Sequence, residues 1–404
     1  MSEAIELNGR RYREPQRPTV VICVDGCDPE YLDHGIPEGV FPTIGSFRRD
    51  GYLGTADAAM PTFTNPNNVS IVTGAPPSVH GIAGNYCLDR QTGHAIMMTD
   101  PALMRSETIL ALMAGVGVRT AAITAKDKLR RLLGRNLAGI CFSSECADAE
   151  VEAMVGRERP DMYSADLSLF VLDAGIALLE QRAAQLLYLS LSDYVQHAHA
   201  PGDPAADAFH RAIDDRVRRF VELGAIVGLV ADHGMNDKAR PNGEPHVVFL
   251  EDELNNRFGA GAVRVICPIT DPFVRHHGAL GSFVRVYARN GSDLTSLMAA
   301  STALPGIAMV VGGAEAARRF ELPLDREADF VVLGDANTVI GASRADHDLS
   351  GLAGHRLRSH GGLGEQRVPF ILSRPLTPGY QHRAETDRLR NFDIFDFALN
   401  GVTD

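Results

Sequence analysis

Short, continuous runs of apolar residues recur along the first part of the chain. Each run has the length of one strand and shows no alternation of polar and apolar positions, which is typical of parallel strands buried on both faces. The pattern predicts strands at Thr19–Val24, Arg119–Thr124, Leu186–Leu191 and Ala225–Ala231. A further run at Phe370–Leu372 indicates that the same sheet resumes near the C-terminus.

The segments between these runs carry apolar residues at helical spacing instead. The predicted helices are Pro42–Arg49, a helix capped by Ser106 that runs to Ala114, Asp166–Gln181, Ala205–Leu223 and Asp393–Leu399. Strand and helix therefore alternate. Alternation of this kind predicts an α/β fold, with a doubly wound, mostly parallel sheet flanked by helices.

The alternation stops after about Glu251. Short strands are predicted within Phe273–Tyr287 and Ala308–Val311, and short helices at Asp293–Ala300 and Ala314–Arg319. At 404 residues the chain exceeds the size at which one core usually suffices, so two substructures are expected. We predict a core domain of residues 1–255 and 346–404, and a smaller inserted α+β cap domain of residues 256–345.

The stretch MPTFTNPNNVSIVTG, from Met60 to Gly74, places a lone hydroxyl in front of a predicted short helix. Asn65 suits the N-cap, Pro66 the first helical position and Gly74 the C-terminal stop. A helix N-terminus presents unpaired N–H groups and the positive end of the helix dipole, which favour a phosphoryl group. Thr64 is therefore a candidate nucleophile, although the same residue could merely support the cap.

Three aspartates follow predicted parallel strands at the edge where open α/β sheets bind ligands. They are Asp25, Asp193 and Asp232. A lone Asp after a strand is usually a turn residue, but Asp232 is followed at once by His233, and Asp193 lies four residues before His197, on one face of a helical turn. Carboxylate oxygen and imidazole nitrogen bind zinc in hydrolytic sites, and they also admit manganese or iron.

His360, in the glycine-rich stretch SHGGLG, is the remaining candidate ligand, because glycines let the backbone approach a crowded metal centre. A histidine in such a loop is more often an ordinary loop residue. The competing histidines are His199, His276, His277 and His347. His199 ranks lower, because a position six after Asp193 turns away from the face that Asp193 shares with His197.

Composition narrows the class of protein. The net charge of −12 argues against a nucleic-acid partner, and no apolar run has the length of about 18 residues that a membrane span needs. The N-terminus lacks the apolar core of a signal peptide, and the six cysteines show no CxxC pair or regular spacing. We therefore expect a cytoplasmic enzyme without a nucleic-acid or membrane partner.

Taken together, these motifs resemble the alkaline phosphatase superfamily of two-metal hydrolases. The resemblance rests on Asp25-Gly26, the Thr64 stretch, Asp193-x-x-x-His197, Asp232-His233-Gly234-Met235 and His360-Gly361, which span nearly the whole chain in this order. The version with threonine is similar to the nucleotide pyrophosphatase/phosphodiesterase branch and, more closely, to the phosphonoacetate hydrolase family.

This resemblance implies two Zn²⁺ ions per chain. It makes Asp25, Thr64, Asp232 and His233 the ligands of one zinc, and Asp193, His197 and His360 the ligands of the other. It also implies that Thr64 attacks phosphorus and forms a phosphothreonine intermediate. The chain departs from classical alkaline phosphatases in having Thr64 where they have serine, and in lacking an obvious arginine beside the nucleophile, which weakens the case for phosphate monoesters.

The substrate is predicted from two lysines. Only three of the 39 basic residues are lysines, and Lys126 and Lys128 follow a predicted strand, so both should lie on the rim that carries the ligands. A charge run is usually a solvated loop, but a compact ammonium also suits a small carboxylate held near a metal. In the resembling hydrolases, lysines of this loop hold the carboxylate of phosphonoacetate, while Asn85 is a candidate donor to a phosphoryl oxygen.

Three functions stay open at this point. The first is hydrolysis of phosphonoacetate, a small-molecule phosphonate, to acetate and phosphate. The second is a nucleotide phosphodiesterase or pyrophosphatase, for which only Phe63 and Tyr86 offer aromatic rings near Thr64. The third is a non-catalytic protein that binds phosphate or metal. The sequence does not fix the oligomeric state, and a homodimer is one open alternative.

Overall fold

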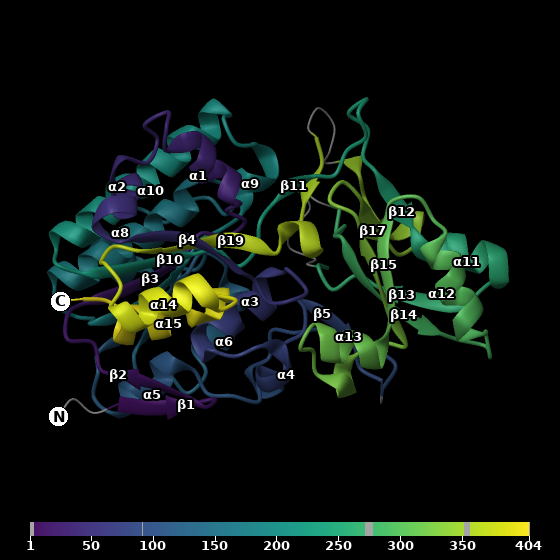
Figure 1. The fold of residues 1–404 in the computed structure, drawn as a ribbon, viewed down its shortest axis with the longest axis horizontal. Helices are drawn as coiled ribbons and strands as arrows, with labels where there is room; N and C mark the ends of the chain where they lie inside the picture. The colour runs from purple at the N-terminus through teal and green to yellow at the C-terminus, as the bar shows by residue number, and fades with distance from the viewer. Residues whose placement is uncertain (1–3, 91, 271–277, 351–355, 404) are drawn as a thin grey trace.

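The computed structural model describes residues 4–90, 92–270, 278–350 and 356–403. Two parts lie side by side in Figure 1, a larger α/β core on the left and a smaller cap on the right. Both chain termini lie at the end of the core that is remote from the cap. None of the described helices has the length and hydropathy needed to cross a membrane.

A seven-stranded sheet forms the centre of the core. Its order is β4 (Tyr52–Asp57), β19 (Arg367–Leu372), β10 (Ile226–Val230), β3 (Thr19–Cys23), β9 (Leu186–Ser190), β7 (Thr120–Thr124) and β8 (Ile140–Ser143). Strands β10, β3, β9, β7 and β8 pair in parallel, whereas β19 runs antiparallel to both of its neighbours. The mostly parallel, alkaline phosphatase-like fold predicted from the sequence is confirmed.

Helices cover both faces of this sheet (Figure 1). One face is packed by α1 (Pro29–Gly35), α2 (Pro42–Asp50), α7 (Ala149–Val155), α8 (Asp166–Glu180), α9 (Tyr194–Ala198) and α10 (Pro204–Glu222). The other is packed by α3 (Thr64–Thr73), α5 (Ile109–Gly115), α6 (Asp127–Leu133), α14 (Pro378–Thr386) and α15 (Ile394–Asp396), with the short α4 (Pro77–His80) alongside α3.

Alternate residues of each parallel strand enter two separate hydrophobic cores. In β3, Val20 and Ile22 pack with α2, α8 and α10, while Val21 and Cys23 pack with α3, α5 and α15. A strand buried on both faces needs apolar side chains at every position. This requirement explains the unbroken apolar runs of the sequence.

The cap is built on a four-stranded antiparallel sheet. Its order is β13 (Val263–Ile266), β14 (Phe283–Ala288), β16 (Phe330–Gly334) and β15 (Ile307–Gly312), and its helices are α11 (Leu250–Phe258), α12 (Leu294–Thr302) and α13 (Gly313–Arg319). The predicted strand start at Phe273 lies outside the described residues. Helix α11 continues through residue 256, the first residue of the predicted cap. The cap boundaries at 256 and 345 stay a prediction.

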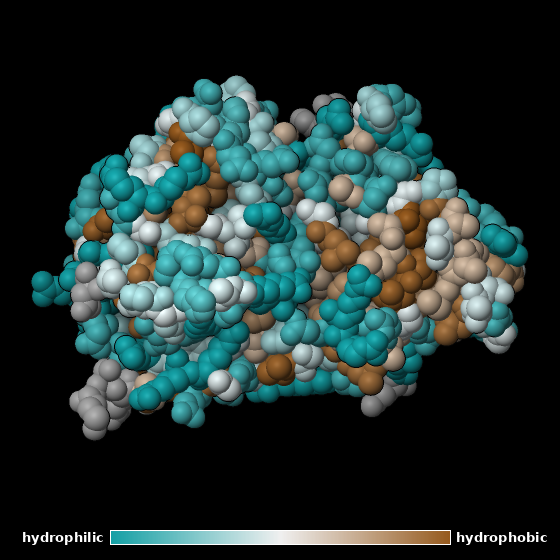
Figure 2. Space-filling view, viewed as in Figure 1, coloured by the Kyte–Doolittle hydropathy of each residue, from teal (hydrophilic) through white to brown (hydrophobic). Residues whose placement is uncertain are grey.

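Hydrophilic residues cover most of the face shown in Figure 2, whereas hydrophobic residues collect over the cap. This region coincides with the place of β15 in Figure 1. Strand β15 is the edge of its sheet, and each of its residues is partly or fully exposed. The apolar run of β15 therefore forms a half-buried edge strand and not a central strand.

Four pairs of short strands were not predicted from the sequence. They are β1 (Ala4–Leu7) with β2 (Arg10–Arg13), β5 (Tyr86–Leu88) with β6 (Ala95–Met97), β11 (Asn236–Asp237) with β18 (Arg358–Ser359), and β12 (Val247–Phe249) with β17 (Val339–Gly341). Two of these pairs join segments about a hundred residues apart in the chain. Pairs of two to four residues leave too little periodicity for a prediction.

Two predicted helix starts were wrong. Helix α3 begins at Thr64 itself after Phe63, and the Asn65 side chain donates to Met98 O instead of capping the helix. Helix α5 begins after Thr108, whose hydroxyl accepts from Ala111 N, and not after Ser106. In α3 a tertiary contact occupies the side chain of the expected cap, and in α5 the hydroxyl of Thr108 caps the helix instead of Ser106.

Gly74 ends α3 in the left-handed conformation, at φ 62°, and packs directly against the Tyr12 hydroxyl of β2. A Cβ added at Gly74 would overlap Tyr12 Oη. Gly156 ends α7 in the same conformation, at φ 77°, but nothing lies within 4 Å of the place where its Cβ would be. Substitution of Gly156 would therefore cause backbone strain alone, whereas substitution of Gly74 would cause both strain and steric overlap.

We expect Gly74→Ala to lower the free energy of unfolding by about 2–4 kcal/mol, because left-handed strain and overpacking add. Gly156→Ala is the control and should cost about 1 kcal/mol, from strain alone. Urea unfolding of the two variants measures the difference. Equal losses would show that Tyr12 yields without cost and that the end of α3 is loosely held.

Candidate metal centre

Four neighbouring strands deliver polar side chains to one edge of the core sheet. Asp25 follows β3, Asp193 follows β9, Asp232 and His233 follow β10, and Lys126 follows β7. Because β10, β3, β9 and β7 are consecutive and parallel, their carboxyl ends share one edge. The structure therefore brings these predicted site residues together.

The first group of side chains surrounds His233. Its Nε2 lies 3.3 Å from Asp25 Oδ1, 3.7 Å from Asp232 Oδ2 and 3.5 Å from Thr64 Oγ1. All four residues are buried. The set that the family resemblance implied for one zinc is thus assembled around one point.

The second group surrounds Asp193. Its Oδ2 lies 3.0 Å from His197 Nε2 and 3.9 Å from His360 Nε2. Asp193, His197 and His360 offer ligand atoms within 4.8 Å of one another, as do Asp25, Asp193 and His233. The rings of His233 and His360 stack at 3.5 Å between centroids, so the two groups adjoin.

Backbone carbonyls orient all three histidines in the same way. Nδ1 lies 3.0 Å from Gly234 O in His233, 2.8 Å from Arg358 O in His197 and 2.8 Å from Thr62 O in His360. A carbonyl can only accept, so each Nδ1 carries a proton and donates, and each Nε2 faces a carboxylate of the centre. Metal-ligating histidines are held in this manner.

Buried negative charge dominates the electrostatics of the centre. Burial and the neighbouring Asp25 raise the pKa of Asp232, whereas burial and the neighbouring His233 and His197 hold the pKa of His360 well below its usual range. In the part of the chain that the structure describes, neither oxygen of Asp25 accepts a hydrogen bond. Close carboxylates and the neutral imidazole of His360 fit a divalent cation such as zinc.

Asn68 fixes Asp232 and the start of α3 together. Its Nδ2 donates to Asp232 Oδ2 at 3.1 Å and to Thr64 O at 3.0 Å, and its Oδ1 accepts from Tyr188 and Ser190. Sequence reasoning missed this residue. Its position four residues after Thr64, on the same helical face, was the available signal.

Asn85 lies at the same helix start. Its Oδ1 accepts from Asn65 N at 3.1 Å, and its Nδ2 reaches Ile269 O only at 3.5 Å. The predicted site residue Asn85 is therefore beside Thr64. Its amide nitrogen makes one long contact to the cap.

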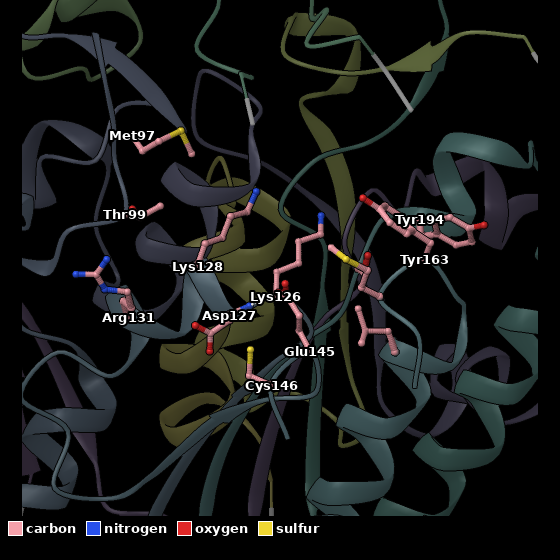
Figure 3. A pocket seen from close by; sticks show the side chains of 13 residues that line it. Met97, Thr99, Lys126, Asp127, Lys128, Arg131, Glu145, Cys146, Tyr163 and Tyr194 are labelled. Atoms are coloured by element: carbon pink, nitrogen blue, oxygen red, sulfur yellow. Dashed lines mark hydrogen bonds between the residues drawn. The ribbon is translucent and has the colours of Figure 1, made fainter. Parts of the chain in front are cut away.

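Both predicted lysines line one cavity of 490 Å³ next to the metal centre (Figure 3). Lys126 Nζ lies 2.7 Å from Asp193 Oδ1 and 3.5 Å from Asp25 Oδ2. Burial and the adjacent Lys126 lower the pKa of Lys128 to about 7. Figure 3 shows both ammonium groups pointing the same way, with Glu145 and Tyr194 on the walls.

The competing histidines lie elsewhere or outside the described residues. His199 pairs with Asp203 at 3.1 Å on the surface side of α9. His347 is held inside the cap by Gly278 O and Ala342 N. His276 and His277 fall in the stretch that the structure does not describe.

The family model of type I phosphodiesterase / nucleotide pyrophosphatase matches residues 19–362 of this chain. Among solved structures, the chain is similar to the phosphonoacetate hydrolase from Sinorhizobium meliloti in complex with phosphonoacetate. The two are 43% identical, each is covered over 100% of its length, and the TM-score is 0.94.

Two curated relatives match over shorter segments. A phosphonoacetate hydrolase of Penicillium oxalicum is 69% identical over 32 residues, which is 8% of this chain. An uncharacterized pyrophosphatase/phosphodiesterase of Schizosaccharomyces pombe is 22% identical over 248 residues, which is 59% of this chain. The matched segments span 44% and 48% of these relatives, about half of their lengths.

The charge of the centre predicts a stabilising response to cations. Protein treated with a chelator should gain thermal stability when Zn²⁺ or Mn²⁺ is added, by about 2.7 kcal/mol at a hundredfold excess over the dissociation constant. Asp25→Asn should lose most of this response, because a buried carboxylate at the centre becomes neutral. Thermal unfolding with and without the cation measures it.

Asp50→Asn is the matched control, since Asp50 is an exposed carboxylate that pairs only with Arg49 among the described contacts. It should respond to the cation as the parent does. An unchanged response in Asp25→Asn would remove Asp25 from the cation site.

Proposed function

The chain belongs to the type I phosphodiesterase / nucleotide pyrophosphatase family of the alkaline phosphatase superfamily, and we propose that it hydrolyses the C–P bond of phosphonoacetate to acetate and phosphate. Members of the superfamily are metal-dependent, and candidate ligand groups are present in this chain. The protein is accordingly a hydrolase acting on phosphorus–carbon or phosphoester bonds.

One observation carries the choice of substrate. Two half-buried lysines, Lys126 and Lys128, line the cavity that adjoins both ligand groups, and Lys126 contacts Asp193 directly. A phosphonate that also bears a carboxylate matches this pairing of cations with a phosphoryl site. Full-length similarity to a hydrolase solved with phosphonoacetate supports the same choice.

We assign the ligand groups to two Zn²⁺ ions. Asp25, Thr64, Asp232 and His233 would hold one, and Asp193, His197 and His360 the other. Divalent cations held there would neutralise the phosphoryl oxygens and favour the ionised form of a coordinated hydroxyl.

Thr64 is the proposed nucleophile. Its Oγ1 gives up its proton to solvent and bonds to phosphorus, the C–P bond breaks, and the bonding electron pair leaves with the carbon. Thr64 begins α3, so the positive end of the helix dipole faces the phosphoryl group, and Asn85 Nδ2 would donate to one of its oxygens. Water then attacks phosphothreonine at phosphorus and releases phosphate and Thr64.

Lys126 and Lys128 are the proposed carboxylate ligands. When the C–P bond breaks, negative charge spreads from the departing carbon to the carboxylate beside the two ammonium groups. These contacts therefore strengthen in the transition state, which is the requirement for catalysis. Protonation of the carbon gives acetate.

The cellular setting is also proposed. Six cysteines without a disulfide fit a reducing compartment, so we place the reaction in the cytoplasm. The substrate is a small molecule, and neither nucleic acid nor membrane is expected as a partner. A homodimer stays an open alternative.

A nucleotide phosphodiesterase is the alternative, favoured by the description of the family model. Such an enzyme would need an aromatic ring to stack a base near Thr64. Phe63 is fully buried against His360 and Gly361, so it offers no free face.

We expect Thr64→Ala to abolish turnover while phosphonoacetate still binds, because the lysines and the other ligands remain. Thr64→Ser should keep part of the activity, since the hydroxyl survives. Phosphate release and isothermal titration with phosphonoacetate measure the two properties. Near-normal turnover in Thr64→Ala would assign the attack to water.

Lys126→Ala and Lys128→Ala should each reduce kcat/KM for phosphonoacetate severely, because each removes a charge-assisted contact of about 1.5–3 kcal/mol. A nitrophenyl phosphodiester develops no charge at that place, so the variants should cleave it about as well as the parent. The quantity to compare is the ratio of kcat/KM for the two substrates.

Arg131→Ala is the control, since Arg131 lines the same cavity but is exposed. Its ratio should stay near that of the parent. A ratio that does not change in the lysine variants, or a parent that prefers the diester, would favour the phosphodiesterase alternative.

A further inference from the structure

Arg358 lies on a ribbon that joins the two ligand groups. It pairs with Asp237 in the β11–β18 ladder, and Asn236 pairs with Ser359. Strand β11 begins three residues after His233, and β18 ends one residue before His360. The ribbon therefore connects the segment that carries His233, of the first group, to the segment that carries His360, of the second group.

The side chain of Arg358 crosses from the ribbon into the core and is only 6% exposed. Its Nε donates to Gln196 O at 2.9 Å, its Nη2 to Met235 O at 3.2 Å, and its Nη1 to Asp237 Oδ1 at 2.5 Å. Tyr31 Oη is a fourth, longer contact at 3.5 Å. Gln196 directly precedes His197, and Met235 lies two residues after His233.

The backbone of Arg358 acts on the same centre. Its carbonyl accepts from His197 Nδ1 at 2.8 Å, which leaves Nε2 facing Asp193 at 3.0 Å. His360 is two residues further along the chain. Arg358 thus contacts Gln196 and His197, at the second ligand group. It also contacts Met235, in the segment that follows His233 of the first group.

We propose that Arg358 is a positioning residue that sets the separation of the two ligand groups, so that both bind their cations tightly. The inference rests on the proposed function only in taking His197, His233 and His360 as metal ligands. Arg358 itself has no atom on the substrate side, because it contacts neither Lys126 nor Lys128 among the described contacts.

The planar guanidinium group of Arg358 suits this positioning role. Three acceptors lie in different directions, and five N–H donors in fixed geometry can reach them at once. A lysine keeps the charge and the contact to Asp237, but its single ammonium cannot also hold Gln196 O and Met235 O. Arg358→Lys therefore removes positioning while it retains the charge.

Arg356 provides a matched control. It lies on the same side of the ribbon and pairs with the other oxygen of Asp237 at 3.0 Å, but its side chain is 53% exposed. Within the described part of the chain, it forms no hydrogen bond with Gln196 or Met235. Arg356→Lys therefore makes the same chemical change beside the same carboxylate, without the contacts to the ligand segments.

The test compares Zn²⁺ affinity in the parent, Arg358→Lys and Arg356→Lys by competition with a chromophoric chelator, using full-length protein freed of metal. Changes in groups that orient metal ligands typically cost 10–100-fold in affinity. We expect a loss of this size in Arg358→Lys and less than a twofold change in Arg356→Lys. Activity of Arg358→Lys should rise toward the parent value as Zn²⁺ is increased, which a merely structural defect would not show.

Equal Zn²⁺ affinities in Arg358→Lys and the parent would overturn the inference and leave the proposed function intact. A parent that binds no Zn²⁺ would overturn both. If Arg358→Lys does not fold, Arg358→Gln is the second variant, because its one amide nitrogen cannot hold Gln196 O and Met235 O together. Its Zn²⁺ affinity should fall by at least threefold, and parent-like affinity would overturn the inference.

Discussion

The repulsion among three buried carboxylates is the constraint on which the rest of this structure depends. Asp25, Asp193 and Asp232 converge where water cannot screen them, and the Lys126 ammonium contacts both Asp25 and Asp193. Like charges buried close together are costly, so such a cluster persists only where the surrounding fold is stable enough to hold it. A divalent cation bound there would relieve the repulsion, and this relief would contribute to the affinity of the site for the cation.

The fold meets this cost with rigid elements. The three carboxylates sit at the ends of strands whose side chains are buried on both faces, so the backbone that carries them has little freedom. Gly26 N, His233 N and Asn68 Nδ2 all donate to Asp232. Orientation is thus supplied by backbone groups and by one buried amide, which leaves the remaining lone pairs pointing inward.

The sequence predicted the parts of this arrangement that local patterns encode. Apolar runs located the strands of the parallel sheet, and the residues after them located Asp25, Asp193, Asp232 and His233. Long-range contacts were out of reach. The β11–β18 ribbon joins residues far apart in the chain over two positions only, and Asn68 gains its role from contacts with Tyr188 and Ser190. The start of α3 was misplaced because Asn65 bonds to Met98 and not to its own helix.

The cap is attached to the second ligand group and not only to the core. Ser282 N, just before β14, donates to His360 O at 2.9 Å, and Ser359 Oγ donates to Leu280 O at 2.6 Å. The ring of His360 is in turn fixed by Thr62 O, which belongs to the core. A displacement of the cap would therefore pull on the backbone of His360, a proposed metal ligand whose ring is anchored to the core. An opening of the cap either breaks these two hydrogen bonds or carries residues 359–360 with it, so the geometry of the candidate cation site depends on the position of the cap.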